Sequence, residues 1–198
     1  MITVNHTDVS ADHIASSAGQ PLPLTEVSIR TAREDGAAGV ATSVVPIGAV
    51  GEICTRGYGV MIGYNDNPEA TAAAIDDEGW LHTGDLATMD KDGYFYIVGR
   101  KKDMINVSGF NVYPNEIEEI VTRMPGVVEA AAIAIPDENS GEAVKLFVVA
   151  SDPELTADKV KAFCRDNLTG YKRPREVEFR DELPKSGVGK VLRRELRN

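Results

Sequence analysis

A lysine near the C-terminus could serve an anionic ligand. Lys190 ends the stretch Gly187-Val188-Gly189-Lys190, and the two glycines let this loop adopt conformations that other residues resist. A compact ammonium on a long stem can reach into a closing cleft. Taken alone, the stretch favours a surface lysine in a flexible tail.

A carboxylate and a guanidinium could together serve a nucleotide. Asp85 follows Thr83-Gly84, and a carboxylate at such a turn can accept hydrogen bonds from both hydroxyls of a ribose. It can equally bond its own backbone. Arg100 opens the run Arg100-Lys101-Lys102-Asp103, and its donor fork suits ribose or phosphate oxygens. Without further motifs, this run indicates a solvated linker.

The charge distribution favours a small anionic ligand. Up to Gly99 there are four basic residues against fourteen acids, whereas from Tyr171 to the end there are nine basic residues against five acids. Such a basic tail suits a nucleotide or coenzyme A, while the acidic remainder would repel a long polyanion. We therefore expect no nucleic-acid partner.

The predicted secondary structure around these residues changes near the middle of the chain. Residues 1–25 show no sustained period and indicate an irregular connector. Short alternating runs and Gly- or Pro-containing turns then predict strands, typical of a small barrel or sandwich. Asn67 and Pro68 are expected to cap and open a short helix.

The second half predicts a compact α+β domain with the order β-β-α-β-β-α-β. Ser108-Gly109 between two apolar runs indicates a tight hairpin. Pro114 opens a helix with one apolar stripe, and Thr156 caps a second amphipathic helix. The chain is therefore expected to divide near residues 99–103.

Composition limits the cellular setting. The chain has no apolar stretch of the roughly 20 residues needed to cross a bilayer, and its first residues do not resemble a signal peptide. Cys54 and Cys164 lie far apart, without metal-ligand spacing, which indicates free thiols and a cytoplasmic location. We expect no metal ligand in this chain.

Five stretches, in order and spacing, resemble the adenylate-forming family of acyl-CoA synthetases, luciferases and peptide-synthetase adenylation domains. Within this family, the sequences of two segments are most similar to those of bacterial long-chain fatty-acid–CoA ligases. These segments are Trp80-Leu81-His82-Thr83-Gly84-Asp85-Leu86 and Leu168-Thr169-Gly170-Tyr171-Lys172-Arg173-Pro174. The five stretches are Gly51-Glu52-Ile53 with Gly63-Tyr64, Trp80–Leu86, Gly99–Asp103, Gly109–Pro114 with Glu116-Ile117-Glu118, and Pro184–Lys190.

The resemblance implies a fold, a reaction and its substrates. It implies a β-rich, barrel-like end of a large N-terminal domain at residues 1–99, a hinge at 100–103, and a small mobile α+β domain at 104–198. In this family a carboxylic acid attacks the α-phosphate of ATP, giving an acyl-adenylate and pyrophosphate, and the CoA thiol then displaces AMP. The expected substrates are a fatty acid, ATP and CoA.

The resemblance also assigns roles to single residues. Lys190 would be the catalytic cation of the first half-reaction, because negative charge crowds where carboxylate and phosphate meet. Asp85 and Arg100 would bind the ribose or phosphate, with Asn111 as a weaker nucleotide contact. Two further sets complete the assignment: Lys102 as the hinge residue, and Ser108 with Gly109 against the pantetheine arm of CoA.

Other conspicuous residues are expected to be structural. Trp80 should pack in the core, and His82 should be a satisfied turn histidine. Cys54 and Cys164 are expected among apolar neighbours, as poor nucleophiles. Two acids in the first turn of a helix, Glu116 and Glu118, should offset its dipole.

Two motifs of the family do not occur in this sequence. These are the Ser/Thr/Gly-rich phosphate loop ending in Pro-Lys-Gly and the Tyr-Gly-x-Thr-Glu stretch that supplies a magnesium-binding glutamate. We therefore expect the Mg²⁺ ligand and the acyl pocket upstream, in a missing N-terminal domain or a partner chain. The chain alone is expected to be nearly inactive, and the full enzyme could make peripheral membrane contact.

Two alternatives remain open. The parent enzyme could activate an aryl or short-chain acid, because the pocket that selects the acid is absent here. The chain could also be a non-catalytic module that retains nucleotide or CoA affinity.

Overall fold

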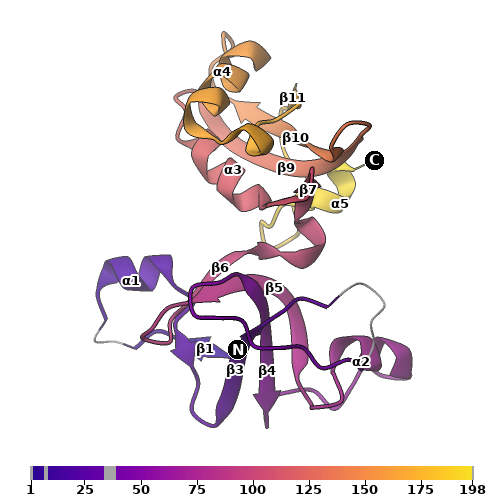
Figure 1. The fold of residues 1–198 in the computed structure, drawn as a ribbon. Helices are drawn as coiled ribbons and strands as arrows, with labels where there is room; N and C mark the ends of the chain where they lie inside the picture. The colour runs from indigo at the N-terminus through magenta and orange to yellow at the C-terminus, as the bar shows by residue number, and fades with distance from the viewer. Residues whose placement is uncertain (1, 7–8, 34–38, 198) are drawn as a thin grey trace. The chain divides into compact units, whose positions relative to one another are not determined.

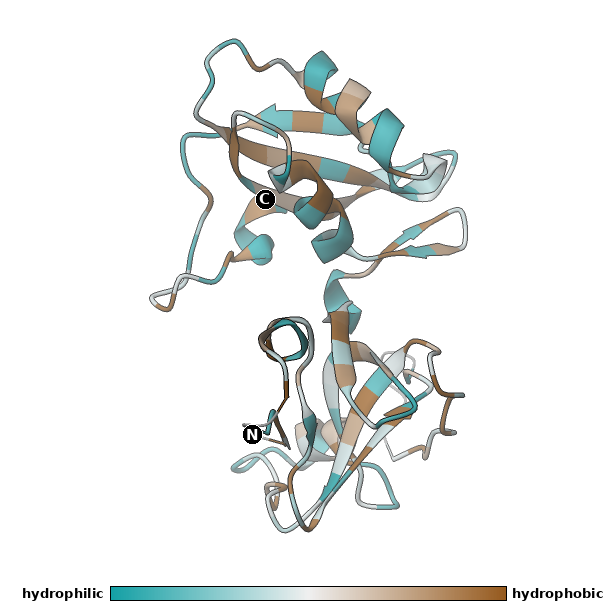
Figure 2. Cartoon of the chain, turned by 90° about the vertical axis from the view of Figure 1, so that its left-hand side faces the viewer, coloured by the Kyte–Doolittle hydropathy of each residue, from teal (hydrophilic) through white to brown (hydrophobic). Residues whose placement is uncertain are grey.

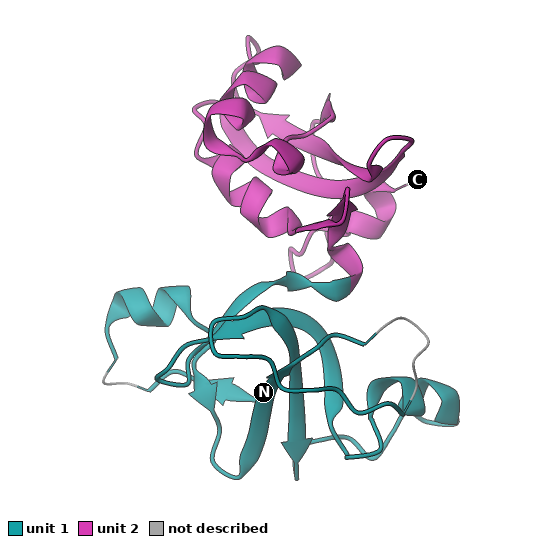
Figure 3. Cartoon of the chain, viewed as in Figure 1, with its two compact units in different colours: residues 1–101 teal, residues 102–198 magenta. Residues whose placement is uncertain are grey.

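The computed structural model describes residues 2–6, 9–33 and 39–197. The chain folds into two compact units, unit 1 with residues 1–101 and unit 2 with residues 102–198 (Figure 3). Polar and apolar segments alternate along the strands, as expected where one face of a strand packs on a core (Figure 2).

Unit 1 is built around a four-stranded antiparallel sheet with the strand order β3-β4-β5-β6 (Figure 1). A short pair, β1 and β2, precedes it. The elements are β1 (Thr3–Val4), α1 (Ala11–Ser16), β2 (Gln20–Pro21), β3 (Thr25–Arg30), β4 (Gly51–Gly57), α2 (Pro68–Ala74), β5 (Leu81–Met89) and β6 (Phe95–Arg100).

The predicted β-rich character of this half is confirmed, but its sheet is open and not barrel-like. In the described ranges the pairings run in a single row from β3 to β6. The short helix predicted after Asn67 is α2, where the Asn67 side chain accepts a hydrogen bond from Ala70 N–H at 2.9 Å and Pro68 takes the first position.

Residues 1–25 are not an irregular connector throughout. Ser10 caps α1, and Thr3 pairs with Pro21 in the β1–β2 ladder. Two backbone hydrogen bonds, Ala18 N–H to Phe95 O and Phe95 N–H to Gly19 O, tie this segment to β6. These partners lie more than seventy positions away, so sequence periodicity carried no sign of them.

Unit 2 is an α+β unit with the predicted order β-β-α-β-β-α-β, followed by one further helix. Its five-stranded sheet centres on β10, which pairs antiparallel with β9 and parallel with β11. The elements are η1 (Lys101–Asp103, which starts at the unit boundary), β7 (Ile105–Val107), β8 (Phe110–Val112), α3 (Pro114–Thr122), β9 (Val127–Asp137), β10 (Gly141–Ala150), α4 (Ala157–Asn167), η2 (Gly170–Lys172), β11 (Glu176–Phe179) and α5 (Arg193–Leu196).

The core of unit 2 is made by the apolar faces that the sequence predicts. Ile117 and Val121 of α3 are fully buried, and so are Val160 and Cys164 of α4. All four belong to one cluster with the strands β7, β8, β9 and β10. A three- to four-residue apolar spacing thus places each helix on the sheet. Among the described residues, no helix has the length and apolarity needed to span a membrane.

Candidate functional site

Asp85 and Arg100 lie side by side on neighbouring strands of unit 1. They are register partners in the β5–β6 ladder, and the Arg100 Nε donates to Asp85 Oδ1 at 2.8 Å. Their side chains are 35% and 55% exposed, respectively. A surface pair of this kind contributes about 0–1 kcal/mol, so a ligand could replace the partner of either group at little cost.

A bulge in the sheet presents Asp85. Residues 83–85 of β5 stand opposite the single residue Ile53 of β4, because the register shifts between the flanking pairs. Gly84 takes φ +74°, and the Thr83 hydroxyl donates to Ile53 O at 2.8 Å and accepts from Asp85 N–H at 3.1 Å. Bulges commonly re-aim side chains beside functional sites. The predicted turn is therefore a bulge within a strand.

His82, just before the bulge, is held by two carboxylates. Its Nδ1 lies 3.0 Å from Glu52 Oε2 and its Nε2 lies 3.2 Å from Asp76 Oδ2. Burial opposes ionisation of Asp76, but hydrogen bonds from Trp80 N–H, His82 and Glu78 N–H outweigh it, so the pKa of Asp76 is lowered. The prediction that His82 is satisfied is confirmed, but the residue lies in strand β5 and not in a turn.

The predictions for Trp80 and Cys164 hold, while those for Cys54 and Glu118 need correction. Trp80 is buried, and Cys164 lies in an apolar core. Cys54 instead contacts polar groups, with its Sγ 3.4 Å from His82 Nδ1 and 3.8 Å from Glu52 O. The surroundings of Cys54 depend on the strand register across the bulge, which cannot be predicted from the local sequence.

The two thiols should be poor nucleophiles in the folded chain. Burial, and next the charge of Glu52, raise the pKa of Cys54 to about 12, and burial raises that of Cys164 to about 11. A raised pKa leaves less thiolate at any pH near neutrality. At about pH 8, both should react with iodoacetamide at least about 10-fold more slowly than in the urea-unfolded chain, as followed by mass spectrometry. Equal rates would contradict this.

Lys190 lies at the end of a tight hairpin in unit 2. Ser186 N–H donates to Lys190 O and Gly189 N–H donates to Ser186 O, both at 2.8 Å, and Gly189 takes φ +79°. The residue is exposed, and its ammonium makes no hydrogen bond or ion pair within the described part of the chain. An unpaired ammonium on a hairpin is available to an anion.

The predicted Ser108-Gly109 hairpin joins β7 and β8. Ser108 and Gly109 have φ of +51° and +85°, which suits a tight two-residue turn. A methyl group added at Gly109 would meet no atom of the described residues within 4 Å. Asn111 is exposed on the same hairpin, where its side chain hydrogen-bonds to that of Tyr113 and opposes the pKa rise that burial causes in Tyr113.

Lys102 is exposed in η1, beside a network that the sequence did not predict. Arg193 Nη2 donates to Glu118 Oε2 at 2.7 Å, and its Nη1 lies 3.7 Å from Asp103 Oδ2. Arg197 Nη2 donates to Asp103 Oδ1 and to Lys102 O, both at 3.2 Å. The first turn of α3 holds Glu116 but not Glu118, so the predicted helix-dipole role is wrong for Glu118, which is a specific ion-pair partner.

Each unit thus gathers its own candidates. In unit 1 the structure brings Asp85 and Arg100 together. In unit 2, Ser108, Gly109 and Asn111 share one hairpin, while Lys190 lies on another. The sequence does not identify three residues of these contacts as functional: Glu52, Asp103 and Arg193. A partial signal exists only for Glu52, which shares one face of a strand with Cys54 through their i, i+2 spacing.

Comparison with known proteins shows what the chain is similar to. Residues 116–190 match the AMP-binding enzyme C-terminal domain. Over all 198 residues the chain is 54% identical to a long-chain-fatty-acid–CoA ligase of Salmonella typhimurium, covering 33% of that protein. It is also 43% identical over its whole length to a Rhodococcus jostii 3-[(3aS,4S,7aS)-7a-methyl-1,5-dioxo-octahydro-1H-inden-4-yl]propanoyl:CoA ligase, covering 35% of it.

The chain is also similar to solved structures. ATP-bound MatB from Rhodopseudomonas palustris superposes with a TM-score of 0.90 at 34% identity, over the whole chain and 38% of that protein. The chain spans about a third of the length of the curated relatives it matches. Residues 116–190 thus match an AMP-binding enzyme C-terminal domain, and the whole chain is similar to the C-terminal third of long-chain-fatty-acid–CoA ligases.

Proposed function

We propose that this chain supplies the C-terminal part of an ATP-dependent long-chain fatty-acid–CoA ligase that works in the cytoplasm. The observation that carries the proposal is the 54% identity to such a ligase over the whole length of this chain. The exposed Asp85–Arg100 pair and the Lys190 ammonium, which is unpaired among the described residues, would provide the charges that the reaction needs. The two free, buried cysteines agree with a reducing compartment.

In the first half-reaction, a fatty-acid carboxylate attacks the α-phosphate of ATP, the acyl-adenylate forms and pyrophosphate leaves. Asp85 would accept hydrogen bonds from the ribose hydroxyls, and Arg100 would contact ribose or phosphate oxygens. Lys190 would stabilise the negative charge that concentrates between the carboxylate and the α-phosphate. Mg²⁺ would be bound by residues outside this chain.

In the second half-reaction, the CoA thiol attacks the acyl carbonyl, the thioester forms and AMP leaves. Lys102 would be the hinge residue that absorbs the backbone change between the two steps. The backbone at Ser108 and Gly109 would lie against the pantetheine arm, and Asn111 would add a polar contact to the nucleotide. No atom in the described part of the chain lies within 4 Å of a methyl group added at Gly109, which leaves room for such an approach.

The proposal is tested with a chimeric ligase in which this chain replaces the C-terminal third of the Salmonella typhimurium relative. ATP–pyrophosphate exchange with palmitate should be robust in the chimeric ligase and nearly absent in the chain alone. Robust exchange by the chain alone, or no exchange by a folded chimera, would contradict the proposed division of labour. A folded chimera that binds AMP and CoA without turnover would favour the non-catalytic module.

Asp85→Asn should weaken the use of ATP by the chimeric ligase. The variant keeps the shape of the side chain but loses the charge that strengthens hydrogen bonds from the ribose, so kcat/KM for ATP should fall about 10- to 100-fold. Asp92→Asn, an exposed acid in the β5–β6 hairpin, is the matched control. Similar kinetics for the two variants would sink the ribose role of Asp85.

Gly109→Ala should slow thioester formation more than adenylation. The added methyl group meets no atom of residues 2–6, 9–33 or 39–197 within 4 Å, so its cost to stability is the strain of φ +85°, about 1–2 kcal/mol. Gly93→Ala carries the same strain at φ +81° with equal free space in unit 1, which makes it a matched control. If both variants slow the transfer from preformed acyl-adenylate to CoA equally, Gly109 does not contact CoA.

The class of acid is a separate question. The Rhodococcus jostii relative is named for a bicyclic propanoate and is 43% identical over this chain, so the C-terminal part is compatible with different acids. The higher identity to the long-chain ligase favours a fatty acid. An aryl or short-chain acid would be favoured if the native upstream sequence, joined to this chain, activated benzoate or acetate in preference to palmitate.

A further inference from the structure

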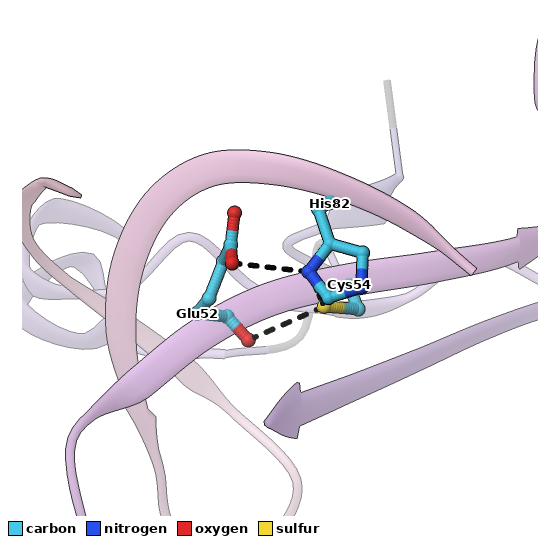
Figure 4. A group of neighbouring side chains, drawn as sticks. All are labelled: Glu52, Cys54 and His82. Atoms are coloured by element: carbon cyan, nitrogen blue, oxygen red, sulfur yellow. Dashed lines mark hydrogen bonds and ion pairs between the residues drawn. The ribbon is translucent and has the colours of Figure 1, made fainter. Parts of the chain in front are cut away.

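A buried carboxylate lies beneath the bulge that presents Asp85. The side chains of Glu52, His82 and Asp76 are only 4%, 3% and 0% exposed, respectively. Figure 4 shows the Glu52 carboxylate facing the His82 ring, with the ion pair between them drawn as a dashed line. Buried charges of this kind are retained only where hydrogen bonds and opposite charges satisfy them.

Glu52 uses its two oxygens for two different tasks. Oε2 binds His82 Nδ1 at 3.0 Å, and Oε1 accepts the Gly84 N–H at 2.9 Å. Residues 83–85 stand opposite Ile53 alone, so the regular ladder cannot pair every backbone group of the bulge. The Glu52 carboxylate substitutes for the missing strand partner of Gly84, immediately before Asp85.

Consecutive hydrogen bonds through His82 and Asp76 fix the position of the Glu52 carboxylate. His82 holds Oε2 from one ring nitrogen, and its other nitrogen is held by Asp76 at 3.2 Å. Asp76 in turn accepts backbone N–H groups of Glu78 and Trp80 at 3.0 and 2.9 Å. A buried network satisfied at each step is rigid.

The same neighbourhood offers sulfur, nitrogen and oxygen donors. Glu52, Cys54 and His82 each place a ligand atom within 4.8 Å of the others, an arrangement that a zinc-type ion could use. The hydrogen bonds already engage both ring nitrogens of His82 and both oxygens of Glu52. The described contacts therefore favour a hydrogen-bonded cluster over a metal centre.

We propose that Glu52 is a positioning residue for nucleotide binding. It holds the Gly84 N–H from below, with His82 and Asp76 as its support, so that the bulge presents the Asp85 carboxylate to ribose hydroxyls. The inference rests on the proposed function, in which Asp85 binds the ribose. Glu52 itself does not touch the nucleotide.

The test uses the ¹⁵N-labelled 198-residue chain and AMP as the probe. Glu52→Ala should speed hydrogen exchange of the Gly84 amide at least about 10-fold and weaken AMP binding about 10-fold, because a hydrogen bond to a charged group is lost and Asp85 is misplaced. Glu52→Gln should rescue both within about 3-fold, since its amide oxygen can accept from Gly84 as the carboxylate does.

Thr55→Val is the matched control. Thr55 is 2% exposed on the same strand, and its hydroxyl donates to Glu26 O at 3.1 Å, away from the bulge. This variant should lower stability without changing AMP affinity. Should Glu52→Ala fail to fold, His82→Gln replaces it, because releasing Glu52 Oε2 should still weaken AMP binding about 3-fold.

Distinct outcomes separate the two proposals. Wild-type AMP affinity in folded Glu52→Ala, or in His82→Gln where that replaces it, would overturn the positioning role and leave the ribose site standing. Absence of AMP-induced shifts around Asp85 in the wild-type chain would overturn the ribose site, and the positioning role with it. Stoichiometric metal in the purified chain that is lost in Cys54→Ser would overturn the hydrogen-bonded cluster.

Discussion

Lys190→Ala should lower the adenylation rate of the chimeric ligase about 10²- to 10³-fold, the loss typical when one group that stabilises transition-state charge is removed. The ammonium is exposed on a hairpin and unpaired among the described residues, so its removal leaves no partner unsatisfied. Stability should therefore change little. The loss should appear in ATP–pyrophosphate exchange with palmitate.

The second half-reaction distinguishes this role from a general one. Transfer from preformed acyl-adenylate to CoA should stay largely intact in Lys190→Ala, because no α-phosphate is attacked in that step. Lys190→Arg should recover only part of the adenylation rate, since a planar guanidinium does not concentrate charge as a compact ammonium does.

Lys185→Ala is the matched control for this hairpin. Lys185 lies on the same hairpin and pairs with Glu129 on the surface, so its loss should have little effect on either step. Equal slowing of adenylation and transfer by Lys190→Ala would contradict a role confined to adenylation. Equal behaviour of the Lys185 and Lys190 variants would remove the assigned role altogether.

Local signals predicted most of unit 2. Ser108-Gly109 predicted a hairpin because glycine readily takes the positive φ that a tight two-residue turn requires, and both residues have positive φ in the structure. The spacing of Ile117, Ile120 and Val121 predicted the buried face of α3, and Thr156 marked the start of α4. Each signal lies within a few residues of the element that it specifies, so no knowledge of distant partners was needed.

The support beneath Asp85 could not be predicted in the same way. The aspartate itself was identified from Thr83-Gly84-Asp85, a local pattern. The contact between Glu52 and Gly84 depends instead on strand pairing and on the bulge that shifts it. A shift of one residue moves every side chain of a strand to the other face, so such contacts follow only from the register.

The helix α5 shows the same limit in unit 2. The sequence of the tail around it indicates only a basic segment, yet Leu196 is 3% exposed and packs in a cluster with Ala131 and Ile133 of β9. Four residues are too few for a period to be recognised, and an isolated helix of this length is unstable in water. Tertiary contacts must hold it, and Arg193 is the residue placed to do so.

Arg193→Ala should destabilise unit 2 by about 2–4 kcal/mol, somewhat less than the cost of breaking a fully buried ion pair. Its guanidinium binds both oxygens of Glu118, at 2.7 and 2.9 Å, and the side chain is 19% exposed against 16% for Glu118. Glu118 Oε1 also accepts Ala132 N–H at 2.8 Å. Removal of Arg193 leaves a largely buried carboxylate without its cation.

Calorimetry of the chain should show this loss in one transition only. For a unit of this size, the midpoint for unit 2 should fall by roughly 10–20 °C. Trp80 is the single tryptophan and lies in unit 1, so its fluorescence should report an unchanged transition there. Arg194→Ala is the matched control, because the Arg194 side chain is 81% exposed and its contact with Glu195, at 3.9 Å, is long and weak.

The comparison of the two arginines also bears on catalysis. Arg193 follows Lys190 by three residues and anchors α5 to α3 through Glu118. If that anchor holds the Lys190 hairpin in place, Arg193→Ala should slow adenylation at temperatures where unit 2 is still folded, whereas Arg194→Ala should not. A destabilised variant with an unchanged adenylation rate would confine Arg193 to stability. Equal midpoints for the Arg193 and Arg194 variants would show that the Glu118 contact contributes nothing to the fold.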